Sequence, residues 1–257
     1  MIQTSELKIF EISKPNFNAS AFEEFLQQEG FIWNRSSDNE IEELVEAAGR
    51  VCYMSFGDGR QSPRDNSEYI ANLIKQGHES VLEHVNWTFV ITGVSRGFTH
   101  QLVRHRVGFA YSQLSQQYHD ESEARFVVPP TIKNKPDLYC SWVKQVESSL
   151  NLYRDLLSQI DENAKNHQFD KKESLRELRT SARSVLPNCT ETKIVVTVNA
   201  RALRHFFKMR GALDGDYEMR NVSSELYKIV SIESPALFQD FKLVDLKDGS
   251  SKLLHTK

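Results

Sequence analysis

The sequence has few cysteines and no long apolar run, and each shortage excludes a class of protein. No apolar stretch approaches the roughly 20 residues that a membrane-spanning helix needs, and the opening segment MIQTSELKIFEISKP lacks the basic-then-apolar layout of a signal peptide. The three cysteines, Cys52, Cys140 and Cys189, lie far apart and form no CxxC pair, which argues against a disulfide framework or a thiolate metal site. We therefore expect a soluble, cytoplasmic protein without a bound metal.

The common glycine-rich ligand loops are absent as well. The chain contains no GxGxxG after a strand, no GxxxxGK[ST] loop and no GxSxG elbow, and HESVLEH at residues 78–84 matches neither HExxH nor HxxEH. A formal net charge of −3 over 257 residues gives no reason to expect a nucleic acid or a membrane as partner. Any nucleotide or flavin must therefore be held by another kind of loop.

Apolar periodicity and capping residues predict a mixed fold in which helices outnumber strands. Strands are expected near the N-terminus and at residues 85–94 and 192–199, where β-branched and aromatic residues are frequent. The expected helices cover residues 39–54, 62–77, 96–106, 138–163, 171–185, 200–210 and 217–230. The pattern predicts an α/β or α+β domain, with a mobile tail from about residue 245 to 257.

One stretch, HQLVRHRVGFAYSQLSQQYH at residues 100–119, is unusually rich in hydrogen-bond donors. It contains three histidines, two arginines and four glutamines, but no Lys, Asp or Glu. On the expected helix, Gln101, Arg104 and His105 stand at i, i+3 and i+4 and so share a face. The arginine fork suits a phosphate or a carbonyl edge, and glutamine amides can bind a pyrimidine or flavin edge. A solvated polar face is the alternative, but the donors lie beside apolar positions, and we favour a binding site.

A second group of donors follows nearly eighty residues later. Its members lie around the strand expected at 192–199 and the helix after it: Arg183, Asn199, Arg201, Arg204, His205 and Arg210. A mixed-charge helix surface explains Arg176 and Arg179 better than a ligand role does. It explains Arg183 poorly, because the neighbours of Arg183 are apolar. Two donor-rich helices from opposite halves of the chain indicate a shared cleft for a polyanion, such as a nucleotide or dinucleotide.

Several separated motifs in these regions resemble those of the flavin-dependent thymidylate synthases. The Arg-His-Arg triplet at 104–106 is followed by VGFAYSQL and Ser115. The resemblance continues upstream through GHESVLEHVNWTFVITGVSRGFTHQLV and downstream through ARSVLP, VNARALRHFFKMR and YEMR, and so covers most of residues 52–220. It implies a thymidylate synthase-complementing-like fold: a single domain over residues 1–257, with a core at about 39–232 and a central, mostly antiparallel sheet flanked by helices.

The resemblance also implies an activity and an assembly. It implies a homotetramer whose active sites lie between subunits and hold FAD, which NADPH reduces. A one-carbon unit would pass from 5,10-methylenetetrahydrofolate to C5 of dUMP and be reduced there, giving dTMP. This chemistry needs no cysteine nucleophile, in agreement with the scattered cysteines.

Matching the family's motifs position by position implies two sets of ligand contacts. The flavin contacts would be Ser80, Glu83, Arg104, His105, Arg106, Gln113, Asn199, Arg201 and His205. The nucleotide contacts would be Gln101, Arg104, Gln113, Leu114, Ser115, Gln116, Gln117, Arg183 and Arg210. Arg210 would be the catalytic residue, because a guanidinium at the N3–C=O edge of uracil stabilises the negative charge that activates C5. Ser115 would bind phosphate within a turn, since no histidine is spaced to deprotonate it.

The sequence departs from the family pattern at three places. The spacer between the triplet and Ser115 has eight residues where the family has seven, and we expect the extra residue to form a bulge around Gly108. Gln117 replaces an arginine, and Asp214 stands where a histidine is often found. Three alternatives therefore stay open: methylation of another uracil nucleotide such as UMP, a flavin protein without catalytic activity, and a non-catalytic nucleic-acid-binding module.

Overall fold

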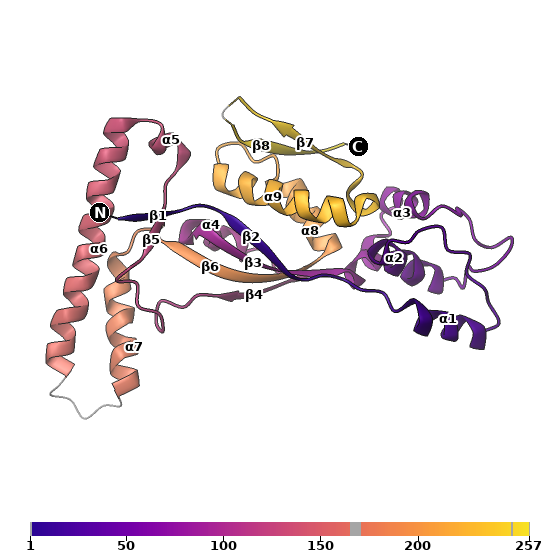
Figure 1. The fold of residues 1–257 in the computed structure, drawn as a ribbon, viewed down its shortest axis with the longest axis horizontal. Helices are drawn as coiled ribbons and strands as arrows, with labels where there is room; N and C mark the ends of the chain where they lie inside the picture. The colour runs from indigo at the N-terminus through magenta and orange to yellow at the C-terminus, as the bar shows by residue number, and fades with distance from the viewer. Residues whose placement is uncertain (1, 165–170, 248, 257) are drawn as a thin grey trace. The chain divides into compact units, whose positions relative to one another are not determined.

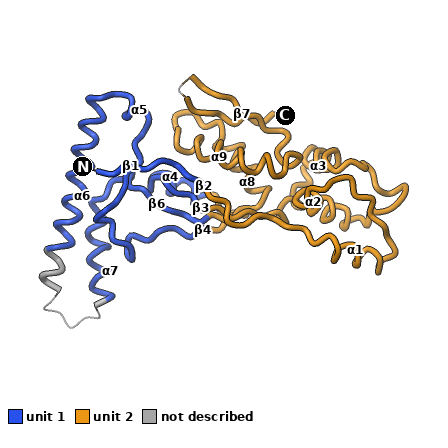
Figure 2. The backbone as a smooth tube through the Cα atoms, in the orientation of Figure 1, with its two compact units in different colours: residues 1–9, 90–104, 111–195 blue, residues 10–89, 105–110, 196–257 orange. Residues whose placement is uncertain are grey.

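The computed structural model describes residues 2–164, 171–247 and 249–256. The chain forms two compact units, shown in Figure 2: unit 1 comprises residues 1–9, 90–104 and 111–195, and unit 2 comprises residues 10–89, 105–110 and 196–257. The single domain over residues 1–257 stays a prediction. Every helix in the described ranges falls short of the length or the apolar content that a membrane span requires.

A four-stranded sheet provides the strands shared by the two units (Figure 1). Its order is β2 (Lys8–Ser13), β3 (Asn86–Ser95), β6 (Glu191–Asn199) and β4 (Phe109–Gln113), and each of these strands has residues in both units. Trp87, Phe89 and Ile91 are buried at alternate positions of β3, as the period of a strand requires. The α/β class with a mostly antiparallel central sheet and flanking helices is confirmed.

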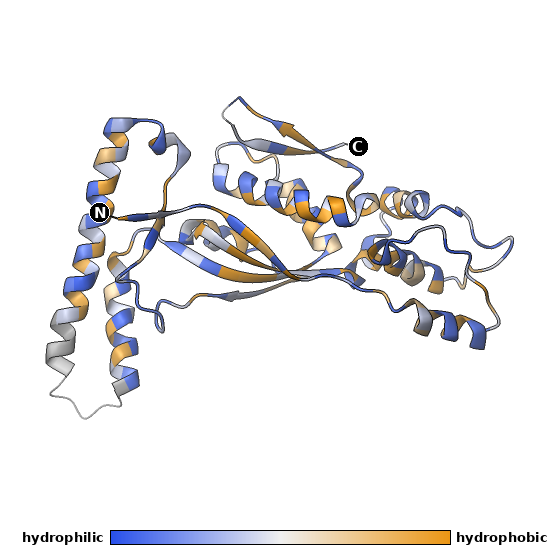
Figure 3. Cartoon of the chain, in the orientation of Figure 1, coloured by the Kyte–Doolittle hydropathy of each residue, from blue (hydrophilic) through white to orange (hydrophobic). Residues whose placement is uncertain are grey.

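Unit 1 combines a small sheet with a helical pair. Strand β1 (Gln3–Ser5) pairs in parallel with β5 (Arg125–Val127). The helices are α4 (Arg96–Leu102), α5 (Pro130–Lys133), α6 (Pro136–Ala164) and α7 (Lys171–Ala182), followed by the 3-10 turn η2 (Arg183–Val185). Helices α6 and α7 pack side by side, and α6 carries alternating polar and apolar bands (Figure 3). Its apolar band covers a core with Phe126 and Val146.

Unit 2 holds the remaining helices and a C-terminal hairpin. Its elements are α1 (Ala19–Gln28), α2 (Glu40–Val51), α3 (Asn66–Lys75), η1 (Glu79–His84), α8 (Ala200–Arg210), α9 (Tyr217–Glu233), η3 (Pro235–Phe238), β7 (Phe241–Asp245) and β8 (Ser251–His255). Phe17, Trp33 and Phe56 form an aromatic core with ring centroids 6.1 and 6.2 Å apart. Phe207 of α8 packs against Phe238 and Phe241 at 5.8 Å, so α8 is anchored by its apolar face.

Arg204 belongs to the structure of unit 2, although the sequence analysis counted it among the donors for a ligand. Its side chain is 1 % exposed, and its two terminal nitrogens donate to the Asp240 carboxylate, each at 2.7 Å. Burial alone would raise the pKa of Asp240, but the hydrogen bonds and charge of Arg204 hold it below its usual range. A buried arginine with a carboxylate partner stabilises the contact of α8 with the C-terminal segment.

Two further expectations differ from the structure. The helix predicted at 96–106 ends at Leu102, with Val103 as its C-cap; Arg104 and His105 therefore do not share a helical face with Gln101. The tail predicted as mobile contains strand β8, which pairs antiparallel with β7 and buries Leu253. Antiparallel pairing with β7 accounts for that strand, since SKLLH has no regular alternation of polar and apolar residues. Positions 248 and 257 of the predicted tail lie outside the described residues.

Candidate functional site

The junction between β6 and α8 positions most of the candidate residues of unit 2. Asn199 ends the strand and caps the helix, because its side-chain oxygen accepts from the Ala202 N–H at 2.8 Å. The Asn199 N–H donates to the Gly108 carbonyl at 3.0 Å, and the Ala200 N–H donates to the Val85 carbonyl at 2.9 Å. Three segments distant in sequence thus meet at one strand-to-helix turn.

Gly108 makes the closest approach to this junction. Its φ is +72°, and a Cβ atom there would lie 2.6 Å from the Asn199 side-chain nitrogen and 2.7 Å from the Ala202 Cβ. A left-handed conformation and this short distance both require glycine. The chain turns at residues 107–108 directly before β4; the bulge expected there from the extra spacer residue stays a prediction.

His105 and Arg210 meet on the outer part of α8. The Arg210 Nε donates to the His105 Nε2 at 3.0 Å. The His105 ring packs edge-on against Phe206, with centroids 5.1 Å apart, and lies 6.3 Å from the His205 ring. Burial lowers the pKa of His105, and the positive charges of Arg210 and His205 lower it further. The imidazole is therefore neutral at neutral pH, as an acceptor of the Arg210 N–H must be.

Four other predicted flavin residues of unit 2 lie at exposed positions of η1 and α8: Ser80, Glu83, Arg201 and His205. Arg201 donates to Glu83 at 2.5 Å, so two residues from distant motifs form an ion pair. Ser80, Arg106 and His205 are exposed. Within the described ranges, Arg106 forms no side-chain ion pair, and neither does Arg104 of unit 1. The donor set is thus rich in arginine and histidine, while its acid Glu83 is already paired, which suits an anionic ligand.

The predicted nucleotide residues of unit 1 gather where β4 meets β6. The Gln113 amide donates to the Thr99 hydroxyl at 3.0 Å and to the Thr192 hydroxyl at 3.3 Å. The Leu114 N–H donates to the Lys193 carbonyl at 2.9 Å. These bonds fix the start of the segment that carries Ser115.

Ser115 lies in a tight turn, as the sequence analysis expected. Its hydroxyl accepts from the Gln117 N–H at 3.3 Å, and its carbonyl accepts from the His119 N–H at 2.9 Å. Gln116 is buried, and its side chain interacts with Glu121, which lowers the pKa of that carboxyl against the effect of burial. The predicted contacts Gln101 and Arg183 are half-buried.

Arg96 is a candidate that the sequence analysis missed. It opens α4 directly after β3, and its guanidinium donates to the Leu114 carbonyl at 3.3 Å and to the Thr192 hydroxyl at 3.5 Å. Burial lowers its pKa, the charge of Glu121 opposes that effect, and the charge of Arg183 adds to it. Burial in turn raises the pKa of Glu121. The sequence did contain a signal for Arg96: an arginine directly after a buried strand and the serine that caps the next helix.

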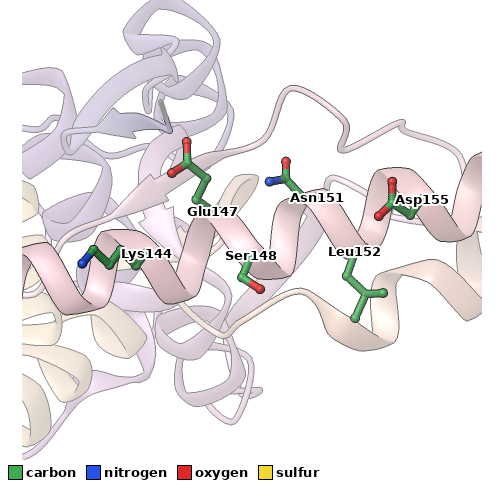
Figure 4. A pocket seen from close by; sticks show the side chains of 6 residues that line it. All are labelled: Lys144, Glu147, Ser148, Asn151, Leu152 and Asp155. Carbon is green, nitrogen blue, oxygen red and sulfur yellow. The ribbon is translucent and has the colours of Figure 1, made fainter.

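A surface hollow on α6 shares none of the candidate residues. It is lined by Lys144, Glu147, Ser148, Asn151, Leu152 and Asp155, all from this one helix (Figure 4). A ligand there would contact a single helix face and remain largely in solvent.

Comparisons with known proteins find relatives that match nearly the whole chain. The model of the family described as thymidylate synthase complementing protein matches residues 36–236. A flavin-dependent thymidylate synthase from Mycolicibacterium gilvum is 38% identical over 250 residues, which are 97% of this chain and 96% of that protein. Proteins of the same name from Mycobacterium avium and Mycobacterium tuberculosis are 40% identical over 231 residues (88% and 90% of the two chains) and 38% identical over 253 residues (97% and 96%).

The crowding at Gly108 predicts a stability effect. Gly108→Ala should lower the free energy of unfolding by more than the roughly 1–2 kcal/mol that a left-handed conformation costs an L-residue, because the new Cβ would also collide with Asn199. Gly215→Ala is the matched control, since Gly215 has a φ of +82° but no atom within 4 Å of its Cβ position. Urea unfolding of the two variants measures the difference. Equal destabilisation would contradict the close contact at Asn199.

Proposed function

Because the chain belongs to the flavin-dependent thymidylate synthase family, we propose that it converts dUMP to dTMP. In this proposal it transfers a one-carbon unit from 5,10-methylenetetrahydrofolate to C5 of dUMP and reduces that unit, with FAD as cofactor and NADPH as reductant. The observation that carries the proposal is the hydrogen bond from Arg210 to a neutral His105. It holds a guanidinium, the group that can activate a uracil ring, at the end of α8.

The donor set fits FAD by its chemistry. A dinucleotide offers two phosphates, and Arg104, Arg106 and Arg201 supply planar cationic forks of the kind that bind phosphate oxygens. Ser80, Glu83, His105, Gln113, Asn199 and His205 complete the proposed flavin contacts. Bound flavin would supply the hydride that completes the methyl group, with NADPH restoring its reduced state.

The residues of unit 1 would hold the nucleotide phosphate. Ser115 and its turn, together with Gln113, Leu114 and Gln116, would supply neutral donors, and Arg183 a charge. Arg96 is the addition from the structure. Its half-buried guanidinium donates to the Leu114 carbonyl and to the Thr192 hydroxyl, which also accepts from Gln113, and a positive charge there favours a phosphate. We propose that Arg96 offsets part of the charge lost where Gln117 replaces an arginine.

Arg210 would act on the base rather than on the phosphate. In the described part of the chain its terminal nitrogens have no hydrogen-bond partner, while its Nε is held by His105. A guanidinium fork can donate to the N3–C4=O edge of uracil and stabilise the negative charge that develops there as C5 attacks. Such stabilisation accelerates the reaction because the charge is greatest in the transition state.

Methylation of UMP is the alternative reaction, because the sequence differs from the family pattern in the segment that would hold the nucleotide. The eight-residue spacer and Gln117 both change the segment that would hold the nucleotide. A nucleic-acid-binding module has less support, because the isoelectric point is about 6.3 and such modules need a basic surface. The homotetramer with sites between subunits and the cytoplasmic location remain predictions of the family resemblance and of the composition.

Loss of one arginine of the triplet should remove the flavin. Arg104→Ala is expected to yield folded but largely colourless protein, because a charge-assisted contact to phosphate is worth about 1.5–3 kcal/mol. Arg60→Ala, which removes another exposed arginine, should keep the yellow colour of the wild type. Visible absorption per protein chain measures the bound flavin. Full FAD occupancy in Arg104→Ala would show that the flavin contacts are misassigned.

Loss of Arg210 should slow the reaction without releasing the cofactor. Arg210→Ala is expected to lower the turnover rate by on the order of 100-fold or more, as for other preorganised charge stabilisers, with FAD still bound. Met209→Ala is the control, because Met209 is the next residue and its side chain is 56% exposed. Steady-state dTMP formation, normalised to bound flavin, gives both rates. Normal turnover in Arg210→Ala would rule out the assigned role.

A further inference from the structure

The hydrogen bond between His105 and Arg210 joins a residue of the flavin set to the residue that would activate the base. Phe206 and Arg210 are one turn apart on α8 and so lie on the same face of the helix. The His105 ring packs edge-on against Phe206 at 5.1 Å, while its Nε2 receives the Arg210 Nε–H at 3.0 Å. The buried Phe206 thus fixes the plane of the imidazole, and the imidazole accepts a hydrogen bond from the arginine.

We infer that His105 is a positioning residue for Arg210: its neutral Nε2 holds the guanidinium by one edge and thereby aims the two terminal nitrogens at the base. This inference rests on the proposed function, and it assigns His105 a second role besides contact with the flavin. The guanidinium is planar, so a hydrogen bond to Nε sets the direction of the remaining donors as well. Arginine side chains otherwise lose rotamer entropy on binding, and His105 removes part of that cost in advance.

The two charged groups that approach His105 from α8 favour its neutral form. Arg210 and His205 approach from α8, Phe206 and Phe109 surround the ring, and Arg104 and Arg106 are its neighbours in sequence. Burial lowers the pKa of His105 below its ordinary value of 6.5, and the Arg210 and His205 charges act in the same direction. A protonated imidazole would have no acceptor at Nε2 and would repel Arg210.

The protonation state of His105 should make turnover depend on pH. The neutral histidine is the competent form, so positioning is complete above the pKa of His105. As the pH falls through that pKa, the imidazole gains a proton, the hydrogen bond is lost and Arg210 is released. Turnover should therefore fall on the acid side, at a pH below 6.5.

The test compares two substitutions in the flavin-loaded enzyme. His105→Gln keeps a side-chain acceptor that does not titrate, whereas His105→Phe keeps a flat ring without an acceptor. The kcat and KM for dUMP are measured between about pH 5 and pH 8, the range in which histidine titrates, and are normalised to bound FAD. We expect His105→Phe to lose on the order of tenfold in kcat at every pH, with a smaller change in KM, as for removal of one hydrogen bond to a charged group. His105→Gln should recover part of that loss and lack the acid-side fall of the wild type.

Two results would overturn the inference. One is an unchanged kcat in His105→Phe; the other is the same acid-side fall in His105→Gln as in the wild type. If the wild-type enzyme forms no dTMP at all, the proposed function fails, and histidine-selective NMR of the purified protein decides the pairing separately. Arg210→Gln should then raise the pKa of His105, because one neighbouring positive charge is gone; an identical titration in both proteins would disprove the pair.

Discussion

The turn at Asn199, where β6 passes into α8, is the constraint on which the arrangement of unit 2 depends. The Asn199 side chain caps the helix, and its backbone N–H donates to the carbonyl of Gly108. Residue 108 must be glycine, because no Cβ fits between it and the Asn199 side chain. The next residue, Ala200, binds the carbonyl of Val85 after η1. The turn therefore sets where α8 begins, and the helix period then sets where its side chains emerge.

The chemistry of the candidate site follows from the two faces of α8. The apolar face packs Phe207 against Phe238 and Phe241, and Arg204 extends this anchoring through its buried pair with Asp240. These contacts fix the position of α8, and so they also fix where its solvent-facing side chains lie. Arg210 is the last residue of α8 and donates to His105, which lies three residues before Gly108. Burial and the charge of Arg210 lower the pKa of this histidine and so favour its neutral form.

Elements whose signals are local could be predicted from the sequence. Strands β3 and β6 and helix α8 follow from β-branched runs and from caps such as Ser95 and Asn199. The end of α4 could not, because residues 103–106 include no glycine or proline, and tertiary contacts decide where such a helix stops. The pairing of Arg210 with His105 spans 105 positions in the chain and has no local signal. Arg96 was missed for a similar reason: its value lies in its contacts with Leu114 and Thr192, both distant in sequence. Ligand roles came from the family resemblance, and the residues alone indicated only a polyanion.

The most direct test of the account is release of tritium from C5-labelled nucleotide to water. The enzyme with FAD would be given 5,10-methylenetetrahydrofolate and NADPH, with labelled deoxyuridylate in one series and labelled uridylate in the other. The account predicts release from deoxyuridylate at the rate at which dTMP forms, and none from uridylate, because replacement of the C5 hydrogen is the step that Arg210 assists. Release from uridylate alone would identify a different substrate, and the absence of release from both would contradict the proposed activity.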